Sequence, residues 1–304
     1  MKSLISIVIP LHNEQEVFFE LLRRLTSVLK DLETDYIFEI IFIDDGSRDA
    51  TWDLVEKAAM SDARIKGNSL SRNFGHQKAL AAGYNSAKGD AIITMDGDLQ
   101  DPPELIGVFL KEWENGFKIV YARRTARTDG FLKRTVASCY YWFLHQISSV
   151  AIARNVGDFR LIDREVLGAL GDLSEASLYW RGAIAWTGLS FTFVDFKRPN
   201  RHAGIPSYTW GKSLQLGLDG IFLCSSFLLH VSLVCAAVGV VVVCCMIGVG
   251  GLKSGNCLWT QIAIMSAFSM QFACLWIVGA YMQRIYDLAR GWPLYVVKKR
   301  IGPL

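Results

Sequence analysis

Charged residues are missing from two long stretches near the carboxyl end of the chain. No Asp, Glu, Lys or Arg occurs from Ile221 to Leu252, and none occurs from Cys257 to Gln283. Each stretch exceeds the roughly 20 apolar residues that a helix needs to cross a bilayer. A core helix of a soluble protein would rarely stay uncharged for so long. The sequence therefore predicts two transmembrane helices, at about 223–251 and 258–282.

Basic residues are scarce between these stretches and frequent outside them. The short connection carries only Lys253. The basic residues that flank the pair are Lys197, Arg198, Arg201, Lys212, Arg284, Arg290, Lys298, Lys299 and Arg300. Because basic segments stay on the cytoplasmic side, we expect an integral protein of the inner or plasma membrane with both termini in the cytoplasm. A net charge of +3 suits anionic lipid headgroups better than nucleic acid.

Other features are also absent. The seven cysteines show no metal-site spacing, and most lie in or beside the uncharged stretches, where they serve as small apolar residues. The first apolar run, Leu4–Ile9, is too short for a signal peptide and is soon followed by Asn and Glu. Nothing repeats along the chain. These absences leave a globular amino-terminal part as the carrier of function.

Residues 1–212 alternate short apolar runs with longer mixed segments. The runs expected to be strands are Leu4–Ile9, Glu39–Ile43, Ile65–Leu70, Ala91–Met95 and Lys118–Tyr121. The segments expected to be helices are Glu14–Lys30, Ala50–Met60, Gln77–Ala87 and Pro103–Glu114. This alternation predicts an α/β domain with a mostly parallel sheet and helices on both faces. A membrane region with a short basic cytoplasmic tail, 213–304, would follow it.

One segment of the amino-terminal part fits two interpretations. Residues 130–150 carry Lys133 and Arg134 near the start and many aromatic residues after them. They form either a core helix or an amphipathic helix on the membrane surface.

Polar clusters follow four of the expected strands directly. They read P-L-H-N-E from Pro10, D-D-G-S from Asp44, S-R-N-F-G from Ser71 and D-G-D-L-Q from Asp96. Parallel sheets bind ligands beyond the carboxyl ends of their strands. We therefore expect these clusters to converge on one edge of the sheet.

The acidic cluster is the most specific of the four. Asp96, Asp98 and Gln100 place two carboxylates and an amide oxygen on one turn. It is not a helix-loop-helix calcium site, because Asp101 stands at the glycine position and Gly107 at the bidentate glutamate position. Mg²⁺ or Mn²⁺ held by so few protein oxygens completes its shell with water and a diphosphate. The alternative is a solvated acidic turn.

The order of the motifs resembles that of the polyprenyl-phosphate glycosyltransferases. Along the chain stand I-V-I-P-L-H-N-E, I-D-D-G-S-R-D-A-T, L-S-R-N-F-G, D-G-D-L-Q-D-P-P-E and N-V-G-D-F-R-L-I-D-R. The polyprenyl-phosphate glycosyltransferases are family-two enzymes of the Rossmann-like GT-A fold. They include bactoprenol glucosyltransferases of the phage serotype-conversion type and dolichyl-phosphate mannose synthases. The resemblance covers nearly the whole chain, including the two uncharged stretches.

The resemblance implies a nucleotide-sugar pocket. Its residues would be Pro10, His12, Glu14, Ile43, Asp45 and Asp96, with Asp96, Asp98 and Gln100 on the metal and diphosphate. Asp98 would be catalytic through the metal. His12 stands where Tyr is common in the family, and a loop histidine without a role is the alternative.

The resemblance also implies a phosphate-binding side for the acceptor. Arg124 fits best among the arginines of Y-A-R-R-T-A-R, and Arg134 would join it. Arg201 and Ser207 belong to R-H-A-G-I-P-S-Y, where Pro206 and Ser207 replace the Ser-Lys pair of the family. Whether Lys212 supplies the missing lysine stays open, and a solvated basic turn is the alternative for Arg124.

Asp158 stands where the family has its candidate catalytic base. The acceptor is a phosphate monoester with a second pKa of about 6, so it is largely ionised near neutrality. Asp158 would then orient a phosphate oxygen or take a residual proton. The alternative is an ion pair with Arg160 or Arg164.

The resemblance thus implies an inverting transfer of one hexose, with glucose from UDP-glucose first. The acceptor would be polyprenyl (undecaprenyl or bactoprenyl) phosphate at the cytoplasmic membrane face, and the cofactor would be Mg²⁺ or Mn²⁺. The product would be a lipid-linked sugar for cell-surface glycans. We also expect a homo-oligomer. Alternatives are GDP-mannose transfer to dolichyl phosphate, modified-pentose transfer, or a non-catalytic nucleotide-sugar sensor or flippase partner. A processive synthase is disfavoured because Q-x-x-R-W is absent, the nearest match being Y-W-R-G at Tyr179–Gly182.

The topology can be tested directly. A reporter fused to the carboxyl terminus should read as cytoplasmic, and a cysteine introduced beside Lys253 should react with a membrane-impermeant reagent in intact cells. Labelling of a cysteine placed near Lys298 by the same reagent would contradict the predicted orientation.

Overall fold

The computed structural model describes residues 2–125, 153, 156–171, 179–197, 227–250 and 257–302. The described part of the chain divides into an α/β unit and a helical unit. The α/β unit takes in the amino-terminal region together with the segment that begins at Pro293, and the helical unit ends at Trp292. The segment 130–150, for which a core helix or a membrane-surface helix was expected, lies outside the described residues.

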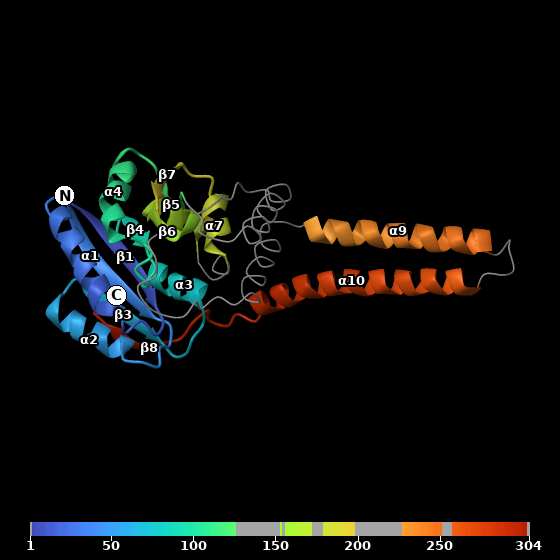
Figure 1. Cartoon of the computed structure of the whole chain (residues 1–304), viewed down its shortest axis with the longest axis horizontal. Coiled ribbons are helices and arrows are strands. Elements are labelled where there is room, and N and C mark those ends of the chain that lie inside the picture. The colour runs from blue at the N-terminus through green and yellow to red at the C-terminus, as the bar shows by residue number, and fades with distance from the viewer. Residues whose placement is uncertain are drawn as a thin grey trace. The chain divides into compact units, whose positions relative to one another are not determined.

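Four parallel strands form the centre of the sheet in the α/β unit. They are β1 (Ser3–Leu11), β2 (Tyr36–Asp44), β3 (Ile65–Leu70) and β4 (Ala91–Thr94). They lie side by side in the order β4-β1-β2-β3; Figure 1 labels β1, β3 and β4 within the α/β unit. The first four predicted strands are confirmed, and their carboxyl ends share one edge of the sheet.

The outer strands make the sheet mixed. They are β5 (Ile119–Arg124), β6 (Val156–Asp163), β7 (Phe191–Phe196) and β8 (Val297–Ile301). The full order is β7-β5-β6-β4-β1-β2-β3-β8. β6 runs antiparallel to both β4 and β5, while β5 and β7 are parallel. The sheet is therefore mostly parallel, as predicted, but β6, β7 and β8 were not anticipated.

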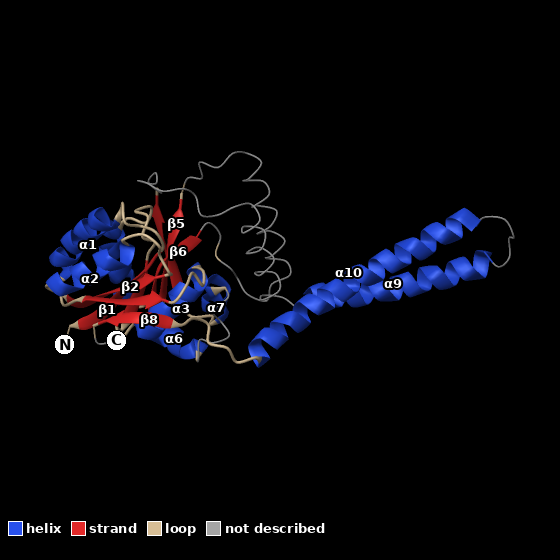
Figure 2. Ribbon diagram, turned by 90° about the horizontal axis from the view of Figure 1, so that it is seen from below, coloured by secondary structure: helices blue, strands red, loops and turns tan. Residues whose placement is uncertain are grey.

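Helices cover both faces of this sheet, as expected (Figure 2). One face carries α1 (Phe18–Leu32), α2 (Thr51–Ser61) and α4 (Ile106–Glu114), which a short 3-10 turn, η1 (Pro103–Leu105), precedes. The other face carries α3 (His76–Ser86), α6 (Arg164–Leu170) and α7 (Trp180–Trp186). The first helix begins at Phe18 rather than at Glu14.

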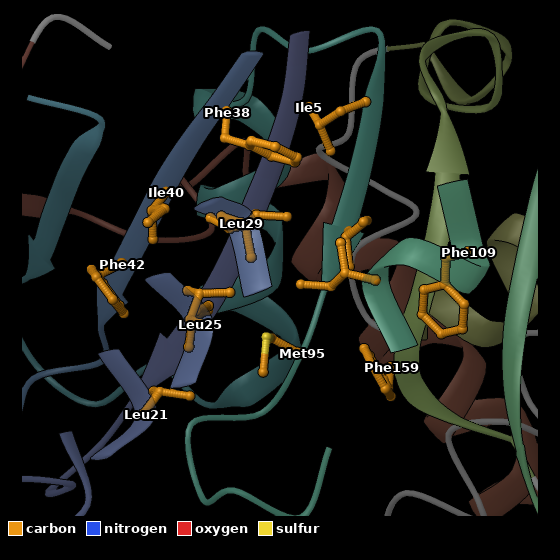
Figure 3. Packing of buried hydrophobic residues seen from close by; sticks show 14 of the residues in the cluster. Ile5, Leu21, Leu25, Leu29, Phe38, Ile40, Phe42, Met95, Phe109 and Phe159 are labelled. Carbon is orange, nitrogen blue, oxygen red and sulfur yellow. The ribbon is translucent and has the colours of Figure 1, made fainter. Parts of the chain in front are cut away.

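Alternation of side chains sorts the core into two layers. Ile5, Ile7 and Ile9 of β1 belong to one buried cluster, whereas Val8 belongs to the other. Helix α1 meets the first cluster with leucines spaced four apart, at 21, 25 and 29, all fully buried (Figure 3). A strand period of two and a helix period of 3.6 require this pattern when one face of each element is buried. Together the layers fix the strand ends that carry the polar clusters.

The same alternation decides which way β6 presents its polar side chains. Phe159 packs against Phe109 of α4, with ring centroids 4.8 Å apart (Figure 3). Its neighbours Asp158 and Arg160 therefore lie on the opposite face, where α3 and α7 pack. This arrangement brings two charged side chains under helices rather than into solvent.

The helical unit consists of α9 (Phe227–Gly250) and α10 (Cys257–Ala289), which pack against each other. Within the described residues, one segment, Ile264–Asp287 of α10, is long and apolar enough to cross a membrane. The apolar segment of α9, Phe227–Val242, is shorter and does not reach this length. One candidate span is thus found, and the second predicted span stays a prediction.

The segment after α10 returns to the α/β unit and adds an edge strand. β8 pairs antiparallel with β3, and Ser71 N donates to Val296 O at 2.8 Å. The side-chain amide of Asn85 donates to the Tyr295 hydroxyl at 3.1 Å. Sequence reasoning saw only a basic tail here, because the run V-K-K-R-I carries three cations. The strand closes the outer edge of β3, which would otherwise expose its main-chain hydrogen-bonding groups.

A truncation tests this edge. Ending the chain after Trp292 removes β8 and should lower the thermal unfolding midpoint of the detergent-solubilised protein by about 5 °C or more, because about 2 kcal/mol of pairing and packing is lost. Ending it after Gly302 leaves β8 whole and serves as the control. Equal midpoints for the two truncations would show that β8 contributes no stability.

Candidate active site

The edge formed by the carboxyl ends of β1 and β2 holds His12 in a defined orientation. Its Nδ1 lies 2.9 Å from the main-chain oxygen of Asp45, so this nitrogen must donate. Its Nε2 then accepts from the side-chain amides of Asn73, at 3.0 Å, and Asn13, at 3.2 Å. The ring is part-exposed and fixed on both sides. The imidazole ring of His12 is therefore held in one orientation, as a side chain that contacts a nucleobase would need to be.

Asp45 organises the loop between β3 and α3. Its carboxylate is buried and accepts from Phe74 N at 2.7 Å and Gly75 N at 2.9 Å. Burial raises the pKa of the Asp45 carboxyl, and the two N–H groups offset only part of that rise. Gly46 follows with φ +66°, and a Cβ there would lie 2.3 Å from the carbonyl carbon of Arg72. The two loops therefore touch main chain to main chain.

Two other pocket residues lie deeper than the resemblance implies. The side chain of Ile43 is fully buried in the cluster beneath α3, and Pro10 is also buried. Glu14 is part-exposed, and its N–H donates to Thr51 Oγ1 at 2.9 Å.

The acidic turn after β4 is buried rather than solvated. Asp98 is 6% exposed and Asp101 is 1% exposed. Gln100 N donates to Asp98 Oδ1 at 3.1 Å, and Asp96 N donates to Asp101 Oδ2 at 3.0 Å. Leu99 adopts φ 62° to close the turn. The main chain thus fixes the carboxylates, and Asp96 remains part-exposed.

The donor set of this turn suits a hard cation that keeps several non-protein ligands. Among the described residues, no group of three or more His, Cys, Asp or Glu side chains is arranged to hold a metal ion. Mg²⁺ is often held by only one or two carboxylates, with water and substrate phosphates in the remaining positions. Asp96 and Asp98 fit that partial shell.

Asp158 is the centre of a charge cluster. Its Oδ1 accepts from Arg160 Nη2 at 2.7 Å and Arg181 Nε at 3.3 Å. Its Oδ2 lies 3.1 Å from Arg181 Nη2 and 3.3 Å from His76 Nε2. Burial opposes ionisation, but Arg181, His76 and Arg160 outweigh it and hold the pKa of the Asp158 carboxyl well below its ordinary value.

His76 connects this cluster with the acidic turn. It is the first residue of α3, and its Nε2 lies 3.7 Å from Asp96 Oδ1 as well as 3.3 Å from Asp158 Oδ2. Burial by itself would lower the pKa of the imidazole. The carboxylates of Asp158 and Asp96 have the larger effect and raise this pKa to about 9. The ring is therefore an imidazolium near neutrality.

The arginines divide between this site and the rest of the fold. A Cβ on Gly157 would lie 2.7 Å from Arg124 Nη2, so the missing side chain lets this guanidinium approach β6 beside Asp158. Arg123 pairs instead with Asp195, at 2.6 Å. Arg164 donates to the carbonyls of Ala87 and Gly89. Of the two ion-pair partners considered for Asp158, the structure shows Arg160.

Three of the expected site residues, Arg134, Arg201 and Ser207, lie outside the described residues. Conversely, sequence reasoning missed His76 and Arg181. His76 directly follows S-R-N-F-G, one of the clusters at the ends of strands, and that position was its only signal. Arg181 lies in Y-W-R-G, whose only signal in the sequence is an incomplete match to the Q-x-x-R-W signature.

Sequence comparison identifies the family. The family model described as "Glycosyl transferase family 2" matches residues 6–171. The chain belongs to glycosyl transferase family 2. A protein named uncharacterized glycosyltransferase YkcC, from Bacillus subtilis, is 36% identical over 98% of this chain and 94% of its own. The bactoprenol glucosyl transferase of Shigella phage SfII is 36% identical over 97% of each chain.

Solved structures show the same fold. Glucosyl-3-phosphoglycerate synthase from Mycobacterium tuberculosis, in complex with Mg²⁺ and UDP, superposes with a TM-score of 0.53 at 17% identity. The match covers 73% of this chain and 79% of that one. The glycosyltransferase therefore has a GT-A-like α/β domain, as predicted.

The contact between the two site loops generates a prediction. Gly46→Ala should lower the free energy of unfolding by about 1–3 kcal/mol, because its positive φ is costly for alanine and its Cβ would overlap the main chain at Arg72. Gly168→Ala, inside α6 with nothing within 4 Å of its Cβ, is the matched control. Chemical denaturation of both variants measures the difference, and equal stabilities would refute the close contact.

Proposed function

We propose that this glycosyltransferase moves glucose from UDP-glucose to bactoprenyl (undecaprenyl) phosphate at the cytoplasmic membrane face, with inversion at the anomeric carbon. The observation that carries the proposal is the match with bactoprenol glucosyl transferases of Shigella phages SfII and SfV, each 36% identical over 97% of this chain. These matches run through the amino-terminal domain and the apolar carboxyl region alike. The geometry of the site supports the same reaction.

The donor side supports nucleotide-diphosphate binding. His12 and Asp45 would face the base from the ends of β1 and β2, with Pro10, Glu14 and Ile43 around them. Asp96, Asp98 and Gln100 would hold Mg²⁺ or Mn²⁺ on the diphosphate. When bound, the metal neutralises the charge that builds on the departing UDP. The resemblance in fold to a synthase solved with Mg²⁺ and UDP agrees with this assignment.

The acceptor side requires little proton chemistry. A phosphate monoester near neutral pH is mostly a dianion, so an oxygen of the acceptor can attack the anomeric carbon without first losing a proton. What the protein must supply is positive charge to bring that dianion close to the donor. Arg124 lies at the end of β5 beside Gly157, where it can do so. Arg134, Arg201 and Ser207 complete the proposed acceptor contacts.

The lipid acceptor accounts for the apolar helices. A polyprenyl phosphate keeps its chain in the bilayer, so an enzyme anchored by α10, and by α9 as the second proposed span, meets its acceptor at the membrane surface. Relatives named for bactoprenol favour this acceptor over dolichyl phosphate. A non-catalytic sensor would have no use for the cationic cluster around Asp158.

A metal-site variant tests the proposal. With UDP-glucose, a short polyprenyl phosphate and Mg²⁺, the wild type should form polyprenyl-phosphate glucose. Asp98→Asn should reduce transfer by about 10²-fold or more, since it weakens the site that stabilises the leaving group, while the thermal midpoint falls little. EDTA should abolish wild-type activity.

Two outcomes would count against the proposal. Full activity of the wild type in EDTA would remove the metal assignment. Transfer from GDP-mannose in preference to UDP-glucose would replace the donor. Glu56→Gln, on the outer helix α2, is the matched control for loss of one carboxylate and should keep wild-type activity.

A further inference from the structure

The carboxylate of Asp158 has no capacity left for a substrate. An ionised carboxylate offers about four lone-pair positions. Four donor contacts reach this one, from Arg160 Nη2, Arg181 Nε, Arg181 Nη2 and His76 Nε2, at 2.7 to 3.3 Å. Asp158 is itself 7% exposed. A proton could enter only by displacing one of these donors, so the geometry fits an anchor for cations and not a proton acceptor.

The three partners of Asp158 differ in what else they can reach. Arg160 is fully buried, so it cannot contact a ligand and serves as an internal counter-charge. Arg181 keeps 22% of its side chain exposed. Asp158 engages the Nε–Nη2 edge of that guanidinium, and the planar fork carries further N–H groups on its opposite end. Arg181 can thus hold Asp158 and an anion together.

Sheet order indicates which anion this is. His12 and Asp45 lie at the ends of β1 and β2, the acidic turn follows β4, and Asp158 lies at the start of β6. Because the order is β6-β4-β1-β2, the base side and Arg181 fall on opposite sides of the diphosphate position. An anion at Arg181 is therefore the acceptor phosphate rather than part of the nucleotide.

We propose that Arg181 binds the acceptor phosphate, and that Asp158 is a positioning residue that holds Arg181 in place. This inference rests on the proposed function. An oxygen of the phosphate dianion forms the new bond to the anomeric carbon, and the bond from that carbon to the UDP oxygen breaks with its electron pair on UDP. No proton has to move, so the reaction requires no base at Asp158.

Acceptor kinetics test the role of Arg181. In the full-length enzyme in detergent, with UDP-glucose, Mg²⁺ and a short polyprenyl phosphate, Arg181→Gln should raise the KM for the acceptor about tenfold or more, the scale of a lost charged hydrogen bond. The Kd for UDP should stay within about twofold of the wild type, the scatter expected for a site that does not contact it. Arg181→Lys should recover part of the loss, because the charge returns but the fork does not.

A matched control separates this effect from loss of charge in general. Arg23→Gln removes an arginine whose exposed ion pair with Glu20 lies on α1. Exposed pairs of this kind contribute little, and the variant should keep the acceptor KM of the wild type. A rise in that KM equal to the rise in Arg181→Gln would overturn the assignment.

Asp158→Asn separates an anchor from a base. In either case the thermal midpoint should fall, because Arg160 stays buried without its counter-charge. An anchor predicts a raised acceptor KM, as in Arg181→Gln. A base predicts a lower kcat at unchanged acceptor KM, and this result would refute the inference. If the variant does not fold, the Arg181 variants decide the question alone.

The outcomes also distinguish failure of the proposed function from failure of the inference about Arg181. A wild-type enzyme that transfers no glucose to polyprenyl phosphate would refute the proposed function. If the wild type transfers and Arg181→Gln keeps its acceptor KM, or loses UDP affinity as strongly as acceptor affinity, the function stands and the inference about Arg181 is wrong.

Discussion

A guanidinium buried without solvent has to be neutralised where it lies, and Arg160 sets this constraint for the whole site. Its side chain is fully buried in the middle of the sheet, where an unpaired charge would cost several kcal/mol. Asp158, two residues earlier on the same face of β6, provides the counter-charge at 2.7 Å. The Asp158 carboxylate also forms ion pairs with Arg181 of α7 and His76 of α3. One buried charge thus determines how three elements meet at the sheet edge.

A second carboxylate extends the arrangement toward the nucleotide side. Asp45 accepts from the N–H groups of Phe74 and Gly75, and the next residue is His76, which reaches both Asp96 and Asp158. A continuous path of contacts therefore runs from the proposed nucleotide-binding residues to the proposed acceptor-binding residues. Transfer between a nucleotide sugar and a lipid phosphate needs both substrates at one carbon atom, and on this proposal these contacts would hold the protein groups for both in register.

Much of this could be predicted because it depends on local pattern. Short apolar runs and their spacing indicate strands and helices, and the parallel-sheet rule then places the clusters at Pro10, Asp44, Ser71 and Asp96 on one edge. The structure confirms this convergence for β1 to β4. The uncharged stretches predict apolar helices from composition alone, and α10 contains such a segment. Family motifs directed attention to Asp158, Arg124 and the acidic turn.

What the sequence by itself determined is therefore the α/β class, the central strands and the residue types available at their carboxyl ends. Tertiary structure alone decided that β6 runs antiparallel beside β4, which brings Asp158 to the same edge as Asp96, and that the basic segment after α10 pairs with β3. It also decided that His76 and Arg181 share one carboxylate. The physical reason is that strand direction, edge pairing and buried ion pairs join residues distant in the chain, and no local period records which distant partner will neutralise a buried charge.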